Sequence, residues 1–358
     1  MKAFKYLLLL LLVIIVACAV YFGAQDGKYS VTRSRDIPAP APVVFEQIDN
    51  LSNWENWGPW MDLDPAMEIQ YNEKPSGIGA AYQWKSDDPN VGNGRMTTTL
   101  VTPNQSVDQE IFFEVPIVGE SKSDIRWDLE PLENNATRVS WTMSGENDLL
   151  SKVMIALSGE DMESSIGEML EQGLENLEAT TQQVMAAYSV NVDGYSNRPG
   201  QYYLYMSTST TRAGFQNNLA QMYGALSQYV ASNNLRTQGM PMAFYEKFDP
   251  ANDAIIFSAA LPTSERIETP LGTNILSGYA PEHRAVKVTL RGNYSHLNEA
   301  WDTAMQYVTE NNLTQLETTD IPPYEIYVTD PGVRPNPADW VTELYIPVAA
   351  PVEPTTIN

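Results

Sequence analysis

The most informative chemical candidate is one acidic residue inside an apolar, alternating segment near the C-terminus. Glu343 lies within VTELYI (341–346), and period-two alternation places it on the same strand face as Val341 and Tyr345. A carboxylate on an apolar face is costly unless a cation or a hydrogen-bond donor satisfies it. Glu343 is therefore a candidate ligand-binding residue for a cationic or donor-rich molecule. The alternative is a charge exposed at the rim of the sheet.

Two groups of aromatic residues are candidate walls of binding sites. An aromatic box around a carboxylate suits a flat or cationic amphiphile, through stacking and cation–π contacts. In the C-terminal half the candidates for such a box are Tyr203, Tyr205, Tyr245 and Tyr279. In the N-terminal half the candidates, which could point into a cavity, are Trp84, Trp127 and Trp141. The alternative for each ring is ordinary packing, because aromatic side chains dominate the energetics of protein cores.

Other kinds of site lack the residues that they need. The chain has one cysteine, Cys18, and two histidines, His283 and His296, which excludes a Cys-based zinc site and a His-rich metal centre. No DxDxDG-type loop, Walker A stretch or GxGxxG stretch occurs. The adjacent Ser295 and His296 lack the separated acid and the oxyanion donors of a catalytic triad. We therefore expect no metal, no cofactor and no nucleophilic catalytic centre.

The charge and the composition exclude one class of function and indicate the number of domains. The 358 residues contain 21 Lys and Arg against 45 Asp and Glu, which gives a formal net charge of −24, and no Lys/Arg-rich run occurs. A chain this acidic repels phosphate backbones, so we expect no binding to nucleic acid. Hydrophobic residues make up 43% of the chain, enough to build folded cores, and the length suits two domains.

The first 27 residues predict a membrane anchor. Residues 6–24, YLLLLLLVIIVACAVYFGA, form a run of 19 residues without a charge. A helix of this length reaches roughly 28 Å, close to the ~30 Å hydrocarbon core of a bilayer. Lys2 and Lys5 precede the run, so the positive-inside rule places the globular part outside the cytoplasmic membrane, in the periplasm. Two alternatives stay open: a cleaved signal peptide, and a lipoprotein acylated at Cys18 within the lipobox-like IVAC (15–18).

Residues 28–188 indicate an antiparallel sheet closed by a long helix. A strand over 29–37 stops before Pro38, and a helix with proline in its first turn follows over 42–48. Apolar residues later recur at helical spacing from Met162 to Tyr188, opposite a row of Glu residues. Between these helices, period-two alternation predicts strands at 81–84, 96–101, 109–115, 124–129 and 138–143. We expect the long helix to lie across the apolar face of the sheet and to leave an internal cavity there.

Both ends of this region resemble the SRPBCC superfamily, also called START-like or polyketide cyclase/dehydrase-like. The beginning, VTRSRDIPAPAPVVFEQIDNLSNWENWGPW (31–60), is similar to the family's strand, I-x-A-P turn, x-V-F-x-x-I helix and W-x-x-W-x-P-W motif. The end, SIGEMLEQGLENLEATTQQ (165–183), resembles the family's closing helix with its G-L-x-N-L signature. The resemblance implies a helix-grip fold that holds hydrophobic ligands. Some members of the superfamily are enzymes, and many are only binders.

The second half of the chain contains an internal repeat. QYVASNNL (228–235) matches QYVTENNL (306–313) at an offset of 78 residues. Each copy places an amphipathic helix after a strand and ends in strands, so we expect strand, helix, strand, strand over 199–262 and again over 283–348. Two units are too few for a solenoid. They can instead pair with pseudo-symmetry, sheet beside sheet, with a cleft at the junction.

The same region resembles the GyrI-like small-molecule-binding domain, which is also the effector-binding domain of AraC-type and MerR-type regulators. Three motifs carry the resemblance: KVTLRGNYSHLNEAWDTAMQYV (287–308), YEIYVTDP (324–331) and WVTELYIPV (340–348). The resemblance implies that Glu343 lies in the ligand cleft, with Tyr294 and Trp301 among its neighbours. Some proteins of the family are hydrolases that activate water with a Glu and a Tyr. The helix-turn-helix module of the regulators has no counterpart in this sequence.

We therefore predict an α+β protein of the bacterial envelope. Its predicted parts are a membrane anchor (1–27), an SRPBCC/START-like domain (28–188), a linker (189–198), a GyrI-like domain (199–350) and a disordered tail (351–358). The predicted function is non-catalytic binding or sensing of a small hydrophobic or amphipathic molecule. The alternative is a small-molecule hydrolase with Glu343 and Tyr294 as its catalytic pair. The sequence identifies neither the ligand nor a protein partner.

Overall fold

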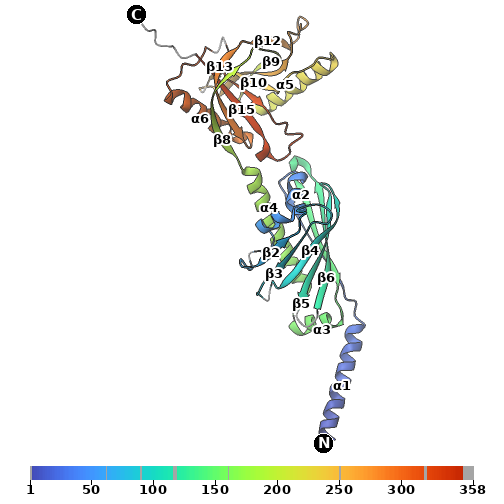
Figure 1. Ribbon diagram of the computed structural model, residues 1–358. Helices are drawn as coiled ribbons and strands as arrows, with labels where there is room; N and C mark the ends of the chain where they lie inside the picture. The colour runs from blue at the N-terminus through green and yellow to red at the C-terminus, as the bar shows by residue number, and fades with distance from the viewer. Residues whose placement is uncertain are drawn as a thin grey trace, which may run out of the picture. The chain divides into compact units, whose positions relative to one another are not determined.

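The chain folds into two compact units, residues 1–184 and 185–358, which Figure 1 colours from blue to green and from green to red. This computed structural model describes residues 2–349 except 62, 89–90, 116–118, 160, 250 and 318–320, so the predicted tail lies outside the described residues. Each unit combines an antiparallel sheet with helices, which confirms the predicted α+β class.

The first unit contains a seven-stranded antiparallel sheet in the order β1-β7-β6-β5-β4-β3-β2. Strands β3 to β7 are joined as consecutive hairpins. The first strand in the sequence, β1, pairs with the last one, β7, so that Lys28 is opposite Glu146 and Ile37 is opposite Thr137. The strands are β1 (Lys28–Ile37), β2 (Glu68–Tyr71), β3 (Ala81–Lys85), β4 (Asn93–Thr102), β5 (Ser106–Val115), β6 (Gly119–Pro131) and β7 (Thr137–Glu146). All of these except the short β2 were expected from alternation.

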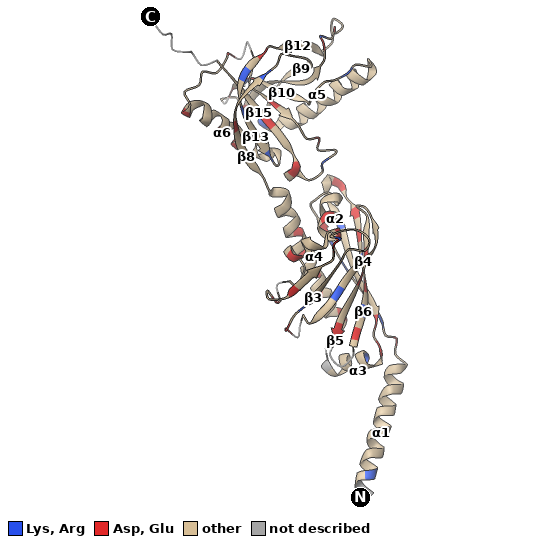
Figure 2. Ribbon diagram, in the orientation of Figure 1, with Lys and Arg blue, Asp and Glu red and all other residues tan. Residues whose placement is uncertain are grey.

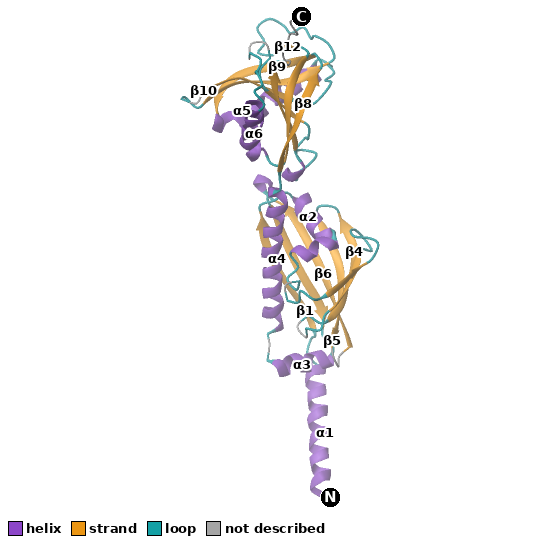
Figure 3. Cartoon of the chain, turned by 60° about the vertical axis from the view of Figure 1, so that its left-hand side comes forward, coloured by secondary structure: helices purple, strands orange, loops and turns teal. Residues whose placement is uncertain are grey.

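The long helix α4 (Met162–Ala186) lies along this sheet, as predicted (Figure 3). It buries Leu170, Leu174 and Leu177. A Cβ atom on Gly173 would lie 2.5 Å from the ring of Trp141, so the glycine of the G-L-x-N-L segment is what allows the helix to approach the sheet this closely. The other helices of the unit are α1 (Lys2–Gly23), α2 (Ala41–Asp49) and α3 (Leu149–Ser158), with short 3-10 turns η1 (Leu51–Asn56) and η2 (Glu133–Asn135).

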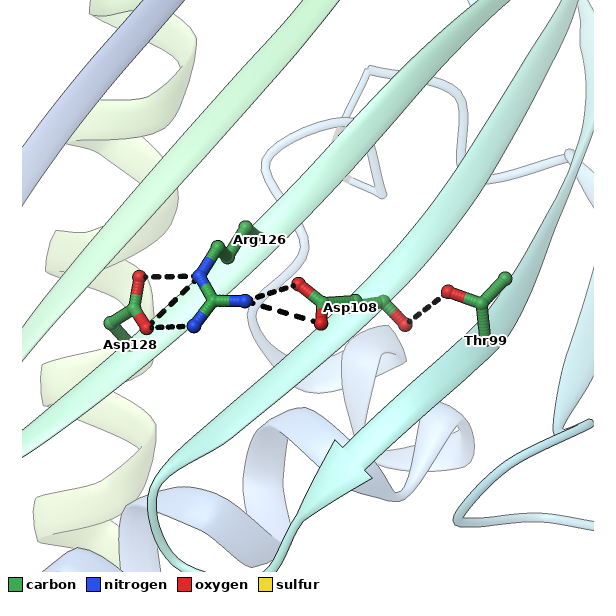
Figure 4. Close-up of polar contacts among 4 residues, drawn as sticks. All are labelled: Thr99, Asp108, Arg126 and Asp128. Atoms are coloured by element: carbon green, nitrogen blue, oxygen red, sulfur yellow. Dashed lines mark hydrogen bonds and ion pairs between the residues drawn. The ribbon is translucent and has the colours of Figure 1, made fainter.

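The outer face of the first sheet is polar. Arg126 on β6 donates to both carboxylate oxygens of Asp108 on β5, at 3.0 and 3.2 Å, and it also binds Asp128 (Figure 4). Thr99 on β4 donates to the Asp108 backbone carbonyl at 3.1 Å. Acidic side chains are spread over both units, whereas α1 carries only two lysines, both near its N-terminal end (Figure 2). The apolar inner face is therefore the one that α4 covers.

The second unit confirms the predicted duplication. Its eight-stranded antiparallel sheet has the order β12-β9-β11-β10-β14-β15-β13-β8, so each repeat contributes three strands and the order reverses at the β10–β14 junction. The first repeat is β9 (Gln201–Thr211), α5 (Arg212–Ser232), β10 (Met242–Asp249) and β11 (Ala254–Thr263). The second is β13 (His283–Arg291), α6 (Leu297–Glu310), β14 (Tyr324–Tyr327) and β15 (Val341–Val348), with short turns η3 (Tyr294–His296) and η4 (Pro337–Asp339).

The repeated Asn-Asn pair has a structural cause. Asn234 and Asn312 both have a φ of 51°, in the left-handed region that Asn tolerates better than most residues. In each repeat the following leucine amide donates back to the last helical turn, Leu235 to the Val230 carbonyl and Leu313 to the Val308 carbonyl. The motif thus ends α5 and α6 in the same way, which explains why it survives in both copies.

The predicted linker at 189–198 is wrong. These residues form β8 (Ser189–Arg198), an edge strand that pairs with β13, while β12 (Leu276–Ala280) occupies the opposite edge beside β9. Most side chains of β8 are exposed. This exposure removes the alternating apolar pattern by which the other strands were found.

Gly173→Ala is expected to destabilise the first unit by about 1–3 kcal/mol, because overpacking against Trp141 outweighs the ~1 kcal/mol gain in helix propensity. Gly224→Ala in α5 is the matched control, since no heavy atom lies within 4 Å of its Cβ position. That variant should stabilise its unit by about 0.5–1 kcal/mol. Chemical denaturation followed by circular dichroism and tryptophan fluorescence measures both changes. Equal effects of the two substitutions would contradict the packing argument.

Candidate functional site

The two faces of the second sheet have different surroundings. Helix α5 packs on Leu204, Ala243 and Phe257, and helix α6 packs on Val286 and Leu344, so both helices cover the same face (Figure 3). The open face carries a separate cluster that includes Phe244, Tyr324, Ile326 and Tyr345. Strand alternation therefore assigns every residue of the central strands to the helix-covered face or to the open face.

A buried carboxylate lies on the helix-covered face, at the junction of the two repeats. Glu325 of β14 is opposite Ala243 of β10, and its exposed fraction is 0%. The Trp301 indole N–H from α6 donates to Glu325 Oε1 at 2.7 Å, and the Tyr327 hydroxyl donates to Oε2 at 2.5 Å. Among the described residues no Lys, Arg or His pairs with this carboxylate. It is thus a desolvated acid that is held by neutral donors.

Aromatic rings from several elements surround Glu325, either directly or through a neighbouring ring. We call the set Trp301, Tyr327, Tyr245, Tyr223, Tyr294 and Trp340 the Glu325 cage. The Tyr245 and Trp301 rings are 5.4 Å apart, and the Tyr294 ring lies 5.6 Å from Tyr327 and 4.8 Å from Trp340. Tyr223 of α5 contacts Tyr327 at 6.2 Å and donates its hydroxyl to the Met242 carbonyl. Only Tyr327 of this set is buried, and the other five rings are partly exposed.

The surroundings of Glu325 change its acidity. Burial raises the pKa of the carboxyl above its ordinary value of 4.5, and the donors on Tyr327, Trp301 and Tyr245 partly offset that rise. Burial, with the nearby negative charge of Glu325, also raises the pKa of Tyr294 to about 12. The cage therefore keeps its hydroxyls protonated, and they remain hydrogen-bond donors at neutral pH.

Glu343 occupies a different place. It is opposite Ile326 of β14 and shares the open face with Tyr345, as its alternation predicted. Its carboxylate pairs with Lys287 at 2.9 Å and accepts from the Tyr345 hydroxyl at 2.7 Å. The predicted neighbourhood is wrong, because Tyr294 and Trp301 lie with Glu325 on the other face of the sheet. The ligand role of Glu343 itself remains a prediction.

A pocket of about 300 Å³ borders Glu343 on the open face. Arg198 lies over the Tyr345 ring and donates to its hydroxyl at 3.3 Å. His283 donates from Nδ1 to the Pro281 carbonyl, so its Nε2 accepts from the Tyr324 hydroxyl at 3.0 Å. Burial lowers the pKa of His283, which keeps this ring neutral and this arrangement intact near pH 7.

The four remaining tyrosine candidates do not gather around one carboxylate. Tyr203 and Tyr205 lie on the open face, where the Tyr203 ring contacts Tyr205 and Phe244 at 5.5 and 4.9 Å. Tyr245 belongs to the Glu325 cage. Tyr279 is 52% exposed on the edge strand β12 and contacts only Tyr202 among the rings described. Their roles as ligand contacts remain predictions.

The tryptophan candidates of the first unit are core residues in this structure. Trp127 and Trp141 are completely buried and stack at 4.2 Å, against Trp54 and Trp57 of the η1 region. Trp84, 4% exposed, packs against Gly94. The Trp127 indole donates to Gln109 at 3.1 Å, whereas the Trp141 indole nitrogen has no partner among the described residues. The rings therefore fill the middle of the space between sheet and helix.

An apolar pocket remains at one end of that space. It measures about 320 Å³ and lies between α3, α4 and the ends of β5 and β7. Its apolar walls are Phe113, Met143, Ile155, Met162, Ile166 and Met169. Methionines are adaptable side chains that suit ligands of variable shape. This pocket, rather than the tryptophan cluster, is the open part of the helix-grip interior.

Glu325 was not among the site residues predicted from the sequence, although the signal was available. Glu325 sits in the apolar strand YEIY (324–327), so the argument applied to Glu343 holds for it equally. The sequence does not show which side chains Glu325 and Glu343 contact. Lys287 is 56 positions before Glu343 in the chain, and only the strand register brings them together.

Two family matches cover most of the chain, one in each unit. Residues 28–182 match the family described as polyketide cyclase / dehydrase and lipid transport, and residues 197–349 match the GyrI-like small molecule binding domain. The chain therefore joins a domain of the first family to a domain of the second, in the order that the motifs predicted.

Solved structures match parts of the chain at low identity. Protein MLL2253 from Mesorhizobium loti is 16% identical, covers 43% of this chain and 98% of its own, and has a TM-score of 0.33. The EcmrR C-terminal domain is 17% identical, covers 46% and 99%, and has a TM-score of 0.40. The Aha1 dimer from Colwellia psychrerythraea is 16% identical, covers 43% and 96%, and has a TM-score of 0.31. No curated protein matches this chain.

Stability should depend on pH through Glu325. Because the pKa of the folded state is raised, folding favours the protonated acid, and stability is lost as the pH rises through that pKa. Glu325→Gln is therefore expected to have a higher Tm than wild type at pH 8 and no such advantage at pH 4. Each kcal/mol corresponds to about 2–4 °C for a domain of this size.

Tyr327→Phe provides the opposite change. It removes a donor that favours the charged carboxylate, so this variant should lose more stability than wild type between pH 4 and pH 8. Differential scanning calorimetry across this range measures both effects. If the difference in Tm between wild type and Glu325→Gln stayed constant with pH, Glu325 would not be the group that makes stability depend on pH.

Proposed function

We propose that the protein is a membrane-anchored binder or sensor of small amphipathic molecules, and that Glu325 receives a cationic group of the ligand. The observation that supports this most directly is a fully buried carboxylate that has, among the described residues, three neutral donors and no cation. A buried charge without a counter-charge is destabilising. A cationic ligand would supply the missing partner.

The cage chemistry suits such a ligand. Indole and phenol rings attract a cation through their faces, and the attraction grows when the site is desolvated. Trp301, Tyr245 and Tyr294 reach the surface while Glu325 does not. To reach the carboxylate, a ligand therefore has to displace side chains of the Glu325 cage.

The open-face carboxylate is the rival position. Glu343 remains a proposed ligand residue because it borders the 300 Å³ pocket. A cationic ligand there would have to compete with Lys287, which already neutralises it at 2.9 Å. Glu325 faces no such competitor among the described residues, so we assign the cation to Glu325.

The geometry gives no support to the alternative hydrolase. That alternative required Glu343 and Tyr294 as a pair, and the two lie on opposite faces of the sheet. The tyrosine hydroxyl that does contact Glu343 belongs to Tyr345, which also receives a hydrogen bond from Arg198. We therefore propose binding without turnover.

Isothermal titration with benzyltrimethylammonium and its neutral carbon isostere tests the site. We expect the cation to bind wild type at least about tenfold more tightly than the isostere. Glu325→Gln should then weaken binding of the cation by about 10–100-fold, which corresponds to the loss of about 1.4–2.8 kcal/mol of ion pairing. Gln keeps the shape of the side chain and removes its charge, so the loss reports the electrostatic contribution.

Glu343→Gln is the matched control, because it makes the same change on the opposite face. It should leave the affinity for the cation within about threefold of wild type, less than the tenfold that corresponds to 1.4 kcal/mol. If Glu343→Gln lost the binding and Glu325→Gln kept it, the ligand would belong to the open-face pocket instead.

The membrane part of the proposal rests on α1. Its segment Phe4–Gly23 has a mean hydropathy of 2.8 and none of it is buried against the rest of the protein. Tyr6 and Tyr21 are both exposed near the two ends, where bilayer-spanning helices commonly carry aromatic residues. We propose that this helix stays attached and crosses the cytoplasmic membrane with the folded units on its outer side.

The anchor is tested by fractionation and mass spectrometry. The intact chain should remain with membranes after an alkaline wash, and removal of residues 1–27 should release it. A reporter that is fused to Asn358 and active only outside the cytoplasm should be active. An acylated Cys18 at the mature N-terminus would establish the lipoprotein alternative, and a shorter unmodified N-terminus would establish a cleaved signal.

A further inference from the structure

Helix α3 exposes its apolar side. Leu150, Met154 and Leu157 follow each other at helical spacing, with exposed fractions of 40, 45 and 78%, and the neighbouring Leu149 is 44% exposed. A helix on the surface of a soluble domain normally turns such a stripe toward the core. Four large apolar side chains on a ten-residue helix indicate a surface that is covered by something else.

The inner side of α3 is tied to the end of α1. Lys152 Nζ donates to the Gln25 carbonyl at 2.6 Å and to the Phe22 carbonyl at 3.4 Å. A cation at this position also complements the negative end of the α1 dipole. The backbone at Gly27 passes so close to Asn147 and Lys152 that a Cβ there would lie 2.4 and 2.7 Å from them. Figure 3 shows α3 directly at the end of α1.

We propose that α3 is a bilayer-surface helix that lies in the lipid headgroup layer with Leu150, Met154 and Leu157 toward the acyl chains. This rests on the proposed membrane anchoring by α1. If α1 spans the bilayer, its C-terminal end is at the lipid–water boundary, and the Lys152 contacts hold α3 at that level. A lipid surface also fits the chemistry, because Lys152 is the only charged residue of α3 and it points to the anchor.

The placement of α3 has a consequence for the apolar pocket of the first unit. Ile155, Met162 and Ile166 line this pocket, and they also line the adjoining hollow that reaches Tyr21 and Phe22 at the end of α1. The two hollows share these walls, so a continuous hollow leads from the end of α1 to the pocket; its outer part also carries charged residues, among them Lys28, Asp161 and Glu163, and its inner part is apolar. We infer that the pocket opens at the membrane surface and takes an acyl chain from the bilayer rather than a solute from water.

Spin labels on the full chain in phosphatidylcholine vesicles test the position of α3. A label on the native Cys18 reports the anchor. In a Cys18→Ser background, labels at Met154→Cys and Leu157→Cys report α3. The matched control is Leu100→Cys, since Leu100 is also an exposed leucine (51%) but lies beside the β4–β5 turn, at the opposite end of the sheet from Lys28.

We expect the two α3 labels to be more accessible to oxygen than to a water-soluble nickel chelate, at a depth of about 5–10 Å within the interface. The Leu100 label should show the reverse preference. A buried Cys18 label together with water-exposed α3 labels would overturn the α3 proposal and leave the anchor standing. A water-exposed Cys18 label would overturn the anchor, and the α3 proposal with it.

Native mass spectrometry tests the pocket. Wild-type protein that is extracted from phosphatidylcholine membranes should carry a lipid, and Met169→Trp, which fills the pocket, should lose it. Met305→Trp is the matched control, because this methionine is 41% exposed on α6. Wild type without lipid, or equal lipid content in both variants, would overturn the inference about the pocket.

Discussion

Each sheet of this protein has an apolar face that helices cover, and the organisation of the possible sites follows from this constraint. In the first unit a single long helix lies along a curved sheet, and aromatic rings fill the middle of the enclosed space. In the second unit each repeat brings its own helix. Two helices leave a seam where β10 meets β14, and Glu325 occupies that seam.

The contrast between Glu325 and Glu343 shows that the partner of an acid, more than its residue type, decides what the acid can do. The two side chains are on neighbouring strands, only one register step apart, but they point to opposite faces. Glu343 has a lysine and is therefore neutralised. Among the described residues, Glu325 has only tyrosine and tryptophan donors, which leave its charge uncompensated.

Much of the fold was predictable because alternation and helical spacing are local properties. The strands of the first unit, the closing helix and the duplicated unit could all be recognised from them. Helix α3, with the sequence LLSKVMIALS, was not predicted because it lacks the polar side that identifies an amphipathic helix. Glu325 was not recognised because its significance depends on distant residues such as Tyr245, 80 positions before it, that only the folded sheet brings near.

The pairing of β1 with β7 also determines the order in which the first unit can assemble. Ile37 and Thr137 are partners across 100 residues, so β1 leaves the ribosome well before β7, its neighbour in the described sheet, exists. At about 5–20 residues per second this interval is about 5–20 s. During it, β1 stays next to the anchor as an unpaired edge. Its charged side chains, Lys28, Arg33, Arg35 and Asp36, protect such an edge from pairing with other chains.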